Sequence, residues 1–453
     1  MLQYQHVLVL GAGRSGQGAA RLLSEHDTKV VILDANADLN KDGVLAYFTE
    51  EEQKQIEIKC GALTDELIAW AGLAILSPGI PIDHEWVLTL EKAGIPVWGE
   101  MELAYRLSRG DVLAITGTNG KTTTTTLLGE IMQHAGRDTF VVGNIGNAYT
   151  AIADQTGDDS VIVAEVSSFQ LESTKEFHPA VSSILNITPD HLNRHYTMEN
   201  YAAVKERIAE KQTADEVCVL NYEDDVLRAF GEKTGAKALY FSSAHILDEG
   251  IWLEDDQIRY NINGSAGQIC HVDELKILGV HNYENVMAAS AMALAYGVDP
   301  VLISEAVGAF EGVAHRIEFV CERDGVVYYN DSKGTNPDAS IRAIKAMRRP
   351  TLLIGGGYDK GSDYKPWIEA FDGKVKEFVL IGVTREAIRD DAIACGFDPD
   401  KIVLLDTFEE AVERCMKDAE EGDAVLLSPA CASWGMFKDY EERGDVFKEL
   451  VRK

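Results

Sequence analysis

Apolar residues recur along this chain in short runs, and each run is followed by glycine or polar residues and then by a longer mixed stretch. Short apolar runs bounded by turn-forming residues predict buried strands, whereas longer mixed stretches predict helices. Strands that alternate with helices in this way form parallel sheets with helices on both faces. We therefore expect strands at residues 7–10, 30–33, 73–76, 112–115, 161–164, 183–185, 217–220, 326–329, 351–354, 378–381, 402–404 and 424–427.

Helices are expected between these strands, with the clearest at about residues 15–25, 201–210 and 283–296 and in the stretch that follows the glycine-containing segment at residues 117–122 and runs to about residue 134. Alternating residues at 251–262 predict a small antiparallel patch. A chain of 453 residues is long enough for about three domains. The units of strand and helix place these domains at residues 1–98, 99–312 and 313–453, and the fold class is α/β.

The strongest chemical signal follows the strand at residues 112–115 and reads Gly117-Thr-Asn-Gly120-Lys121-Thr122. Strand, glycine loop, Lys-Thr and helix is the order of a phosphate cradle, in which backbone N–H groups and a helix N-terminus bind phosphate oxygens. Lys121 would contact the β- and γ-phosphates of ATP, and the Thr122 hydroxyl would hold Mg²⁺. Only two residues separate Gly117 from Gly120, which is shorter than the usual Walker spacing. The alternative is a glycine turn with an exposed lysine.

A second glycine motif, Gly11-Ala-Gly13-Arg14-Ser15-Gly16, follows the first expected strand, and Asp34 ends the next one. This pattern is typical of a dinucleotide fingerprint, with the acidic residue placed to meet a ribose or a base. A single motif of this kind is weak evidence. It favours a nucleotide diphosphate at a helix N-terminus over a nicotinamide, and a close turn between helix and strand remains the alternative.

Three further residues are candidates for the chemistry. Glu165 ends the strand at residues 161–164, where a carboxylate can face a neighbouring phosphate loop and hold Mg²⁺. His191 lies in a loop after the next strand and would coordinate a metal or orient a water, although a lone loop histidine more often does neither. Lys205 lies in the helix expected at residues 201–210 and, taken alone, reads as a surface lysine.

Composition narrows the class of ligand. The net charge is −32 and no cluster of Lys and Arg is present, which argues against nucleic acid and against an anionic membrane surface. Anionic ligands would then depend on a few local cations, for which the loop residues Lys121, Arg194, Arg316, Lys333 and Lys360 are candidates. The seven cysteines are scattered without a C-x-x-C pair, and no long apolar span or signal segment is visible. We expect a reduced, cytoplasmic protein without membrane insertion.

Taken together and in order, these motifs resemble the Mur ligase superfamily of ATP-dependent, amide-forming enzymes of peptidoglycan assembly. The resemblance covers essentially the whole chain. It is carried by Gly117–Thr122, Glu165, Asn186-Ile-Thr-Pro-Asp-His191, Tyr201-Ala-Ala-Val-Lys205, His281-Asn-Tyr-Glu-Asn285, Ala314-His-Arg316, Asn330-Asp-Ser-Lys-Gly-Thr335, Gly355-Gly-Gly-Tyr-Asp-Lys360 and Leu427-Ser-Pro-Ala-Cys-Ala-Ser433. It implies three domains: a Rossmann-like N-terminal domain that binds a UDP-linked substrate, a central P-loop-type ATPase domain and a Rossmann-like C-terminal domain that binds an amino acid.

Within the superfamily, the segments at residues 331–335 and 428–433 are most similar to members that add D-glutamate to UDP-N-acetylmuramoyl-L-alanine. The Asp-Asn-Pro-Arg motif of the diamino-acid-adding members and the Asp-Gly-Ala-His-Asn-Pro stretch of folylpolyglutamate synthetases are absent. The implied reaction is an ATP-dependent, ADP-forming ligation through an acyl phosphate, in peptidoglycan precursor synthesis and hence in cell shape and division. The alternative is another amino-acid-adding ligase of the same superfamily. The implied partners are the UDP-linked substrate, D-glutamate and ATP, and the enzyme is expected to be a monomer.

The resemblance also implies roles for individual residues. Those assigned to catalysis are Lys121, Glu165, His191, Lys205 and Lys333. Those assigned to ATP are Gly117, Thr118, Asn119, Gly120, Lys121, Thr122, Thr123, Asn282, Asn285, Arg316 and Asp331. Those assigned to the UDP-linked substrate are Gly13, Arg14, Ser15, Asp34, Gly79, Asn144 and Ser167. D-Glutamate would be held by Thr335, Lys360 and Ser433. Two Mg²⁺ ions are implied, held by Thr122, Glu165, His191 and a carbamylated Lys205.

Two other classes explain part of the sequence. A nicotinamide-dependent oxidoreductase would use the Gly11 motif and Asp34, but it leaves the second phosphate loop without a purpose. A nucleotide-binding switch or motor would use the Gly117 loop, but it leaves the third domain unexplained. A hydrolase centred on Ser433 is disfavoured, because Gly-x-Ser-x-Gly is absent around that serine.

Overall fold

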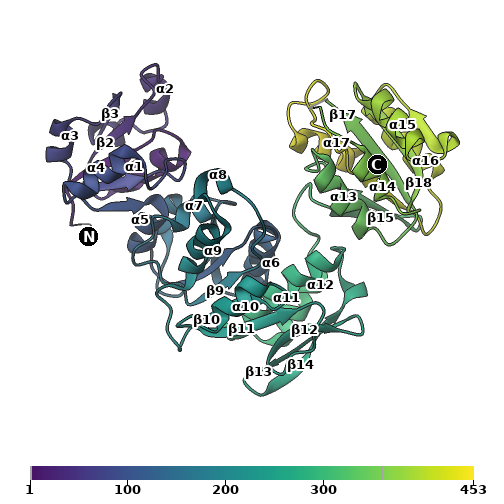
Figure 1. Ribbon diagram of the computed structural model, residues 1–453, viewed down its shortest axis with the longest axis horizontal. Helices are drawn as coiled ribbons and strands as arrows, with labels where there is room; N and C mark the ends of the chain where they lie inside the picture. Colours follow the sequence, from purple (N-terminus) through teal and green to yellow (C-terminus); the bar gives the residue numbers. More distant parts are fainter. Residues whose placement is uncertain (1–2, 359–360) are drawn as a thin grey trace. The chain divides into compact units, whose positions relative to one another are not determined.

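The computed structural model describes residues 3–358 and 361–453 and contains three sheets, which Figure 1 shows with helices packed on them. The chain forms two compact units. The first unit comprises Met1–Ile269 and Glu284–Ala306, and the second comprises Cys270–Tyr283 and Val307–Lys453. The expected α/β class is confirmed, whereas the domain boundaries at residues 98 and 312 stay a prediction.

The N-terminal sheet of the first unit has the strand order β3-β2-β1-β4-β5, and all of its strand pairs are parallel. Apolar side chains of α1 and α5 pack on one face and those of α3 and α4 on the other. Open sheets of this kind bind ligands beyond the carboxyl ends of their strands. The elements are β1 (His6–Leu10), α1 (Arg14–Glu25), β2 (Lys29–Asp34), α2 (Lys41–Leu45), β3 (Ile56–Cys60), α3 (Asp65–Trp70), β4 (Leu73–Leu76), α4 (Glu85–Lys92), β5 (Val97–Gly99) and α5 (Glu100–Leu107).

The central sheet has the order β14-β13-β12-β11-β10-β9-β6-β8-β7. In this spatial order, every neighbouring pair between β12 and β7 is parallel, and this part of the sheet includes β6. Strands β12 and β13 form the expected antiparallel patch. The strands are β6 (Asp111–Thr116), β7 (Asp138–Gly143), β8 (Ser160–Glu165), β9 (Val181–Ile184), β10 (Val217–Asn221), β11 (Lys237–Ser242), β12 (Gly250–Glu254), β13 (Gln257–Ile262) and β14 (Ser265–His271). The helices are α6 (Lys121–His134), α7 (Ser168–Leu171), α8 (Leu192–His195), α9 (Met198–Glu206), α10 (Asp225–Gly231), α11 (Val280–Ala295) and α12 (Pro300–Ala309).

The helix expected at residues 201–210 is placed wrongly. It begins at Met198, because the Thr197 side chain accepts a hydrogen bond from the backbone N–H of Asn200 and caps the helix. Its last turn gives way to a 3₁₀ segment, Arg207–Ala209. The prediction also missed β3, β5, β7, β11 and β14, which are very short or are only partly buried and so lack a continuous apolar run. No helix in the described part of the chain is long and apolar enough to cross a membrane.

The sheet of the second unit has the order β15-β16-β20-β17-β18-β19. It is parallel except for β15, an edge strand that the sequence did not reveal and that pairs antiparallel with β16. Helices α13 to α15 cover one face, and α16 and α17 cover the other. The elements are β15 (Glu318–Arg323), β16 (Val326–Asn330), α13 (Pro337–Ala346), β17 (Thr351–Gly357), α14 (Lys365–Glu369), β18 (Val375–Gly382), α15 (Arg385–Ala394), β19 (Ile402–Leu404), α16 (Phe408–Asp418), β20 (Ala424–Leu427) and α17 (Tyr440–Arg452).

Candidate active site

The phosphate loop lies where the sequence predicts it, between the end of β6 at Thr116 and the start of α6 at Lys121. Gly120 has φ of +85°, and a Cβ at that position would lie 2.3 Å from Oδ1 of Asn285. Only glycine fits there, for both conformational and steric reasons. No side chain caps α6, so its first N–H groups are available to a phosphate.

Asn186 holds this loop from the neighbouring strand end. Its carbonyl accepts the N–H of Thr118 at 2.9 Å, and its Oδ1 accepts the N–H of Asn119 at 2.8 Å. The sequence motif contained Asn186, but no role was predicted for it. The Lys121 ammonium donates to the carbonyls of Gly117 and Thr118, at 2.9 Å each. A positive charge is thereby kept over the cradle.

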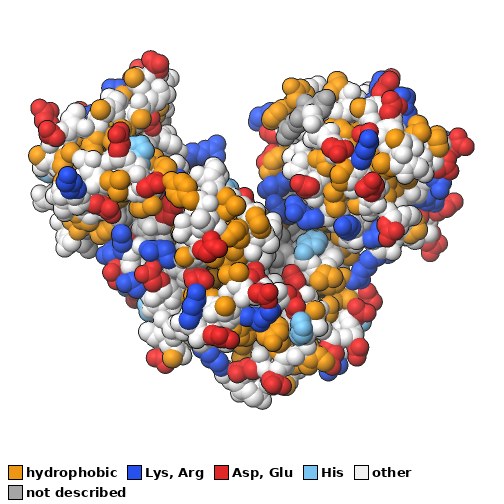
Figure 2. All heavy atoms as spheres, viewed as in Figure 1, with side chains coloured by type: hydrophobic (Ala, Val, Ile, Leu, Met, Phe, Trp, Pro, Cys, Tyr) orange, Lys and Arg blue, Asp and Glu red, His pale blue; other side chains and the backbone are white. Residues whose placement is uncertain are grey.

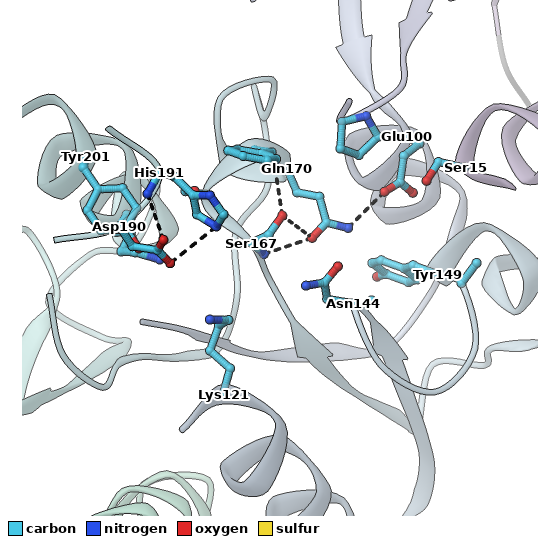
Figure 3. Close-up of a pocket in the computed structure, with 16 residues that line it drawn as sticks. Ser15, Glu100, Lys121, Asn144, Tyr149, Ser167, Gln170, Asp190, His191 and Tyr201 are labelled. Atoms are coloured by element: carbon cyan, nitrogen blue, oxygen red, sulfur yellow. Dashed lines mark hydrogen bonds and ion pairs between the residues drawn. The ribbon is translucent and has the colours of Figure 1, made fainter. Parts of the chain in front are cut away.

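A cavity of about 370 Å³ opens beside this loop, within the first unit. It brings together six residues that were assigned to the site from the sequence or from the family resemblance: Ser15, Lys121, Asn144, Ser167, His191 and Lys205. Figure 3 shows Lys121 rising from the start of α6 and Ser15 lying at the opposite end, beside Glu100. Ser15 of the first glycine motif and Lys121 of the phosphate loop therefore line a single pocket.

Lys205 is not the surface lysine that its local sequence indicates. The residue is only 2% exposed, because α9 packs against the phosphate loop, and Nζ donates to the Gly117 carbonyl at 2.8 Å. Burial, and then the charge of Lys121, lower the pKa of Lys205 to about 7, while Asp190 opposes the shift. A substantial fraction of this amine is therefore neutral near neutral pH.

Glu165 ends β8, directly beside Ile115 of β6. The residue is buried, and its Oε2 has no hydrogen-bond partner. A buried carboxylate oxygen without a donor is costly unless a cation meets it, and carboxylate oxygen is a preferred ligand of Mg²⁺. No group of three or more His, Cys, Asp and Glu side chains that could hold a metal occurs in residues 3–358 and 361–453. Glu165 fits Mg²⁺ whose remaining ligands are hydroxyl, phosphate or water oxygens.

His191 lines the same cavity in a left-handed backbone conformation, with φ of +52°. Its Nε2 lies 3.4 Å from Oδ2 of Asp190, and its ring lies against Phe169. About half of each side chain in this His–Asp pair is exposed, which leaves the imidazole accessible from the pocket.

On the N-terminal side, α1 starts close to β1 because Gly16 lacks a side chain: a Cβ there would lie 2.0 Å from the Gly11 carbonyl oxygen. The carboxylate of Asp34 accepts the N–H of Ala12 at 2.8 Å and so fixes the glycine loop. Of the other residues assigned to the UDP-linked substrate, Gly13, Arg14 and Gly79 are exposed and lie outside the cavity lining.

One series of hydrogen bonds across the pocket was not predicted from the sequence. Gln170 donates to Oε1 of the buried Glu100 at 3.0 Å, and the Gln170 oxygen accepts both the N–H and the hydroxyl of Ser167 (Figure 3). Burial raises the pKa of Glu100, and the bond from Gln170 partly offsets this. The only local signal was an acidic residue directly after Gly99 at a helix start.

Arg194 does not serve as a free cation for an anionic ligand. Its guanidinium pairs with Glu172 at 2.6 Å and donates to the Ile80 carbonyl at 3.0 Å, with weaker contacts to the carbonyls of Pro78 and Gly79. The side chain is 10% exposed. It connects the central domain to the loop after β4 instead.

The second unit carries its own polar cluster at the carboxyl ends of β16 and β20. Asp331 is buried, accepts the Ser428 hydroxyl at 2.7 Å and receives the Ile317 N–H at 3.3 Å. Burial raises the pKa of Asp331 to about 7, against the effect of those donors. Lys333 lies over the ring of Tyr440, with Nζ 5.5 Å from the centroid.

The remaining predicted residues are divided between the two units. Thr335 and Ser433 lie in the loops that follow β16 and β20, and Arg316 is exposed. Asn285 in the first unit accepts the Thr124 hydroxyl at 3.2 Å, while Asn282 in the second donates to the Leu278 carbonyl at 2.8 Å. Lys360 lies outside the described residues.

Three family models match successive parts of the chain. They are the Mur ligase MurD-like N-terminal domain at residues 5–99, the Mur ligase middle domain at residues 115–293 and the Mur ligase glutamate ligase domain at residues 315–431. The three-domain α/β class is thereby confirmed.

Curated relatives match over nearly the full length. The UDP-N-acetylmuramoylalanine--D-glutamate ligase of Lachnoclostridium phytofermentans is 53% identical over 98% of this chain and 97% of its own. The protein of that name from Lachnospira eligens is 50% identical over 99% of both chains.

Solved structures support the fold. UDP-N-acetylmuramate-alanine ligase MurC from Thermotoga maritima superposes with a TM-score of 0.57 at 18% identity, covering 99% of both chains. A UDP-N-acetylmuramoyl-L-alanyl-D-glutamate--2,6-diaminopimelate ligase gives 0.59 at 17% identity, over 94% of this chain and 93% of that one. On the full-length relatives and the ordered domain matches, the chain belongs to the Mur ligase family.

Proposed function

We propose that this protein is the ATP-dependent ligase that joins D-glutamate to UDP-N-acetylmuramoyl-L-alanine in peptidoglycan precursor synthesis, releasing ADP and phosphate. The observation that carries the proposal is the cavity of the first unit, in which the phosphate-loop Lys121 lies in one pocket with Ser15, Asn144 and Ser167. The full-length relatives named for this reaction support the same conclusion.

The chemistry begins with transfer of the γ-phosphoryl group of ATP to the alanine carboxylate. A carboxylate oxygen attacks phosphorus, the bond to the bridging oxygen breaks, and ADP leaves. Such transfers depend mainly on positioning and on neutralising charge. Lys121 and the N-terminal N–H groups of α6, which no side chain caps, supply fixed positive potential at the cradle. Mg²⁺, when bound, supplies further charge neutralisation at the phosphate oxygens.

The metal would be held by Glu165 and Thr122, with His191 and a modified Lys205 for a second ion. The support is the orphaned Oε2 of Glu165 and the common pocket of His191 and Lys205. Ser15, Asn144 and Ser167 would hold the UDP-linked substrate in that pocket. Asp34 would act as well, through the Gly11–Gly16 loop that it fixes, with Gly13, Arg14 and Gly79 at the outer edge.

The amine of D-glutamate then attacks the acyl phosphate, and the tetrahedral intermediate collapses to the amide and phosphate. We assign the D-glutamate carboxylates to Thr335 and Ser433, together with Lys360. Lys333, Arg316 and Asp331, with Asn282 and Asn285, would contact ATP.

Carbamylation of Lys205 would turn a buried cation into an anionic oxygen ligand. The neutral Nζ attacks CO₂, a C–N bond forms while one C=O electron pair moves to oxygen, and nitrogen releases a proton. The support is the pKa of Lys205, lowered to about 7 by burial and by Lys121. Enzyme equilibrated with ¹³CO₂ and Mg²⁺ should give a carbamate carbon resonance that Lys205→Ala removes. A bare ammonium under these conditions would rule the modification out.

One assay tests the whole proposal: ADP and phosphate release with ATP, UDP-N-acetylmuramoyl-L-alanine and a panel of amino acids. We expect turnover with D-glutamate and little with other amino acids. Turnover with a different amino acid would favour another ligase of the superfamily, and tight NAD binding that excess UDP-substrate does not displace would overturn the N-terminal assignment. We expect a cytoplasmic monomer, for which sedimentation tests the oligomeric state.

A further inference from the structure

The first turn of α17 contains an arginine that its sequence gives no reason to notice. Arg443 stands in Tyr440-Glu-Glu-Arg-Gly-Asp445, which reads as a charged, solvated helix start. Its residue exposure is nevertheless only 1%, and it is among the largest fully buried side chains in the described part of the molecule. A guanidinium in that position must have its N–H donors satisfied inside the fold.

The donors of Arg443 reach two different loops. Nε donates to the Ser332 hydroxyl at 2.9 Å and Nη2 to the Ser332 carbonyl at 2.8 Å, in the loop after β16. Nη1 and Nη2 both donate to the Cys431 carbonyl at 3.3 Å, in the loop after β20. The planar fork of an arginine suits such a multiple contact, which an ammonium cannot reproduce.

Arg443, with the two loops that its guanidinium joins, lies where the helices change from one face of the sheet to the other. β20 lies between β16 and β17, and α13 after β16 and α17 after β20 cover opposite faces of the sheet. Ligands of doubly wound sheets gather at such a change of face. The end of β17 also meets Arg443, because a Cβ on Gly357 would lie 3.5 Å from Nη1.

The two residues that Arg443 contacts lie close before those proposed to hold the ligands: Ser332 directly precedes Lys333, and Cys431 lies two residues before Ser433. A planar trans peptide points its N–H away from its carbonyl. Fixing the Ser332 carbonyl toward Arg443 therefore turns the Lys333 N–H to the other side, where it donates to the His315 carbonyl at 2.9 Å. The Cys431 carbonyl fixes the next peptide plane in the same way.

Stability alone is a poor explanation for this arrangement. The acceptors are two carbonyls and a hydroxyl, not a carboxylate, and apolar replacement of a buried ion is often neutral or stabilising. Burial lowers the pKa of Arg443 to about 10, so the group stays charged at neutral pH. A second bond, from the Ser428 hydroxyl to Asp331, already joins the same two loops.

We infer that Arg443 is a positioning residue for the amino-acid step: its guanidinium sets the spacing between the Lys333–Thr335 loop and the Ser433 loop, and thereby the affinity for D-glutamate. This inference deepens the proposed function and depends on it. It predicts a defect in D-glutamate use that does not extend to the UDP-linked substrate, whose proposed contacts belong to the first unit.

The test compares Arg443→Met, Arg443→Lys and the control Arg452→Met, an exposed arginine of the same helix whose guanidinium contacts the Val320 carbonyl. Arg443→Met should raise KM for D-glutamate at least ten-fold and change KM for the UDP-substrate less than two-fold. Arg443→Lys should fall between it and the native enzyme, and Arg452→Met should behave as native. An Arg443→Ala variant should recover part of its D-glutamate affinity when millimolar guanidinium is added, because the free ion replaces the missing side-chain group.

Hydrogen exchange supplies a readout independent of turnover. Arg443→Met should speed exchange in residues 331–335 and 430–433 without a comparable change around the phosphate loop. Equal KM changes for both substrates, or native D-glutamate KM in a folded Arg443→Met, would overturn the inference. If Arg443→Met does not fold, the same comparison of the two KM values is made with Arg443→Lys, and the same outcomes support or overturn the inference. A native enzyme with no D-glutamate-dependent ADP release would instead defeat the proposed function.

Discussion

At the scale of the residue, Lys121 is the group on which phosphoryl transfer depends most. Lys121→Ala should lower kcat by about 10³-fold, because the developing phosphate charge loses a preorganised cation. It should also cost little stability, since the bonds to the Gly117 and Thr118 carbonyls that it removes lie at a partly buried position. Lys92→Ala, which changes an exposed lysine of α4, is the control. Near-native turnover by a folded Lys121→Ala enzyme would contradict the assignment.

Lys205 makes a prediction about stability and pH. Its pKa is about 7 in the folded state, against an ordinary value near 10.5, so the unfolded chain binds the extra proton between these values. The stability of the native protein relative to Lys205→Met should therefore rise with pH across that window. In CO₂-free buffer we expect Lys205→Met to be more stable than native by a few kcal/mol at pH 6, and the difference to shrink by pH 9.

Urea denaturation at several pH values measures this effect, and Lys211→Met, at an exposed position near the same helix, should show none of it. A difference that is independent of pH would mean that the burial cost of Lys205 is not electrostatic.

Individual residues also differ in whether their role in the site can be predicted from the sequence. Lys121 was found because glycine spacing and helix order belong to one local motif. The burial of Lys205 was not, since it depends on α9 packing against a loop more than 80 residues earlier in the chain. Arg443 and Glu100 were missed for the same reason: each is a charged residue at a helix start, and only tertiary contacts distinguish it from a solvated one.

At the scale of the element, Arg194 and Glu172 join the loop after β4 to the central domain. Arg194→Met should destabilise the protein by about 3–5 kcal/mol, because the buried Glu172 loses its guanidinium partner and keeps the His195 imidazole, 3.3 Å away, beside it. It should also raise KM for the UDP-substrate, since Gly79 lies in the released loop. Urea denaturation and steady-state kinetics measure the two effects.

The matched control is the double variant Arg194→Met with Glu172→Met. It removes both charges, so most of the lost stability should return while the KM defect persists. If the double variant is no more stable than the single one, the cost does not come from the carboxylate that lost its guanidinium.

The elements themselves were predicted unevenly, and the reason is physical. Strands buried on both faces, such as β1, β8 and β20, are continuous apolar runs and were found. Edge strands such as β15 and β7 keep exposed or half-exposed positions, so their sequences carry no such run. The phosphate loop could be placed because the strand before it, β6, and the helix after it, α6, both have clear sequence patterns.

At the scale of the whole molecule, the net charge of −32 opposes the approach of anionic substrates. Figure 2 shows acidic side chains spread over the face in view and not gathered in one patch, so the opposing field is general. Local cations such as Lys121 act only within the pocket. Salt shortens the screening length from about 30 Å at 0.01 M to about 8 Å at 0.15 M. The association rate of the UDP-substrate should therefore rise several-fold over that range, the reverse of a steered encounter.

Stopped-flow binding measures that rate, and charge reversal separates the global field from local contacts. Glu50→Lys and Glu91→Lys change exposed residues of the N-terminal domain, outside the lining of the pocket. Together they should speed association at 0.01 M salt and have little effect at 0.15 M, where the field is already screened. An association rate that falls with salt would mean that the few cations of the pocket outweigh the charge of the rest of the molecule, and that the enzyme attracts its anionic substrate from a distance despite its composition.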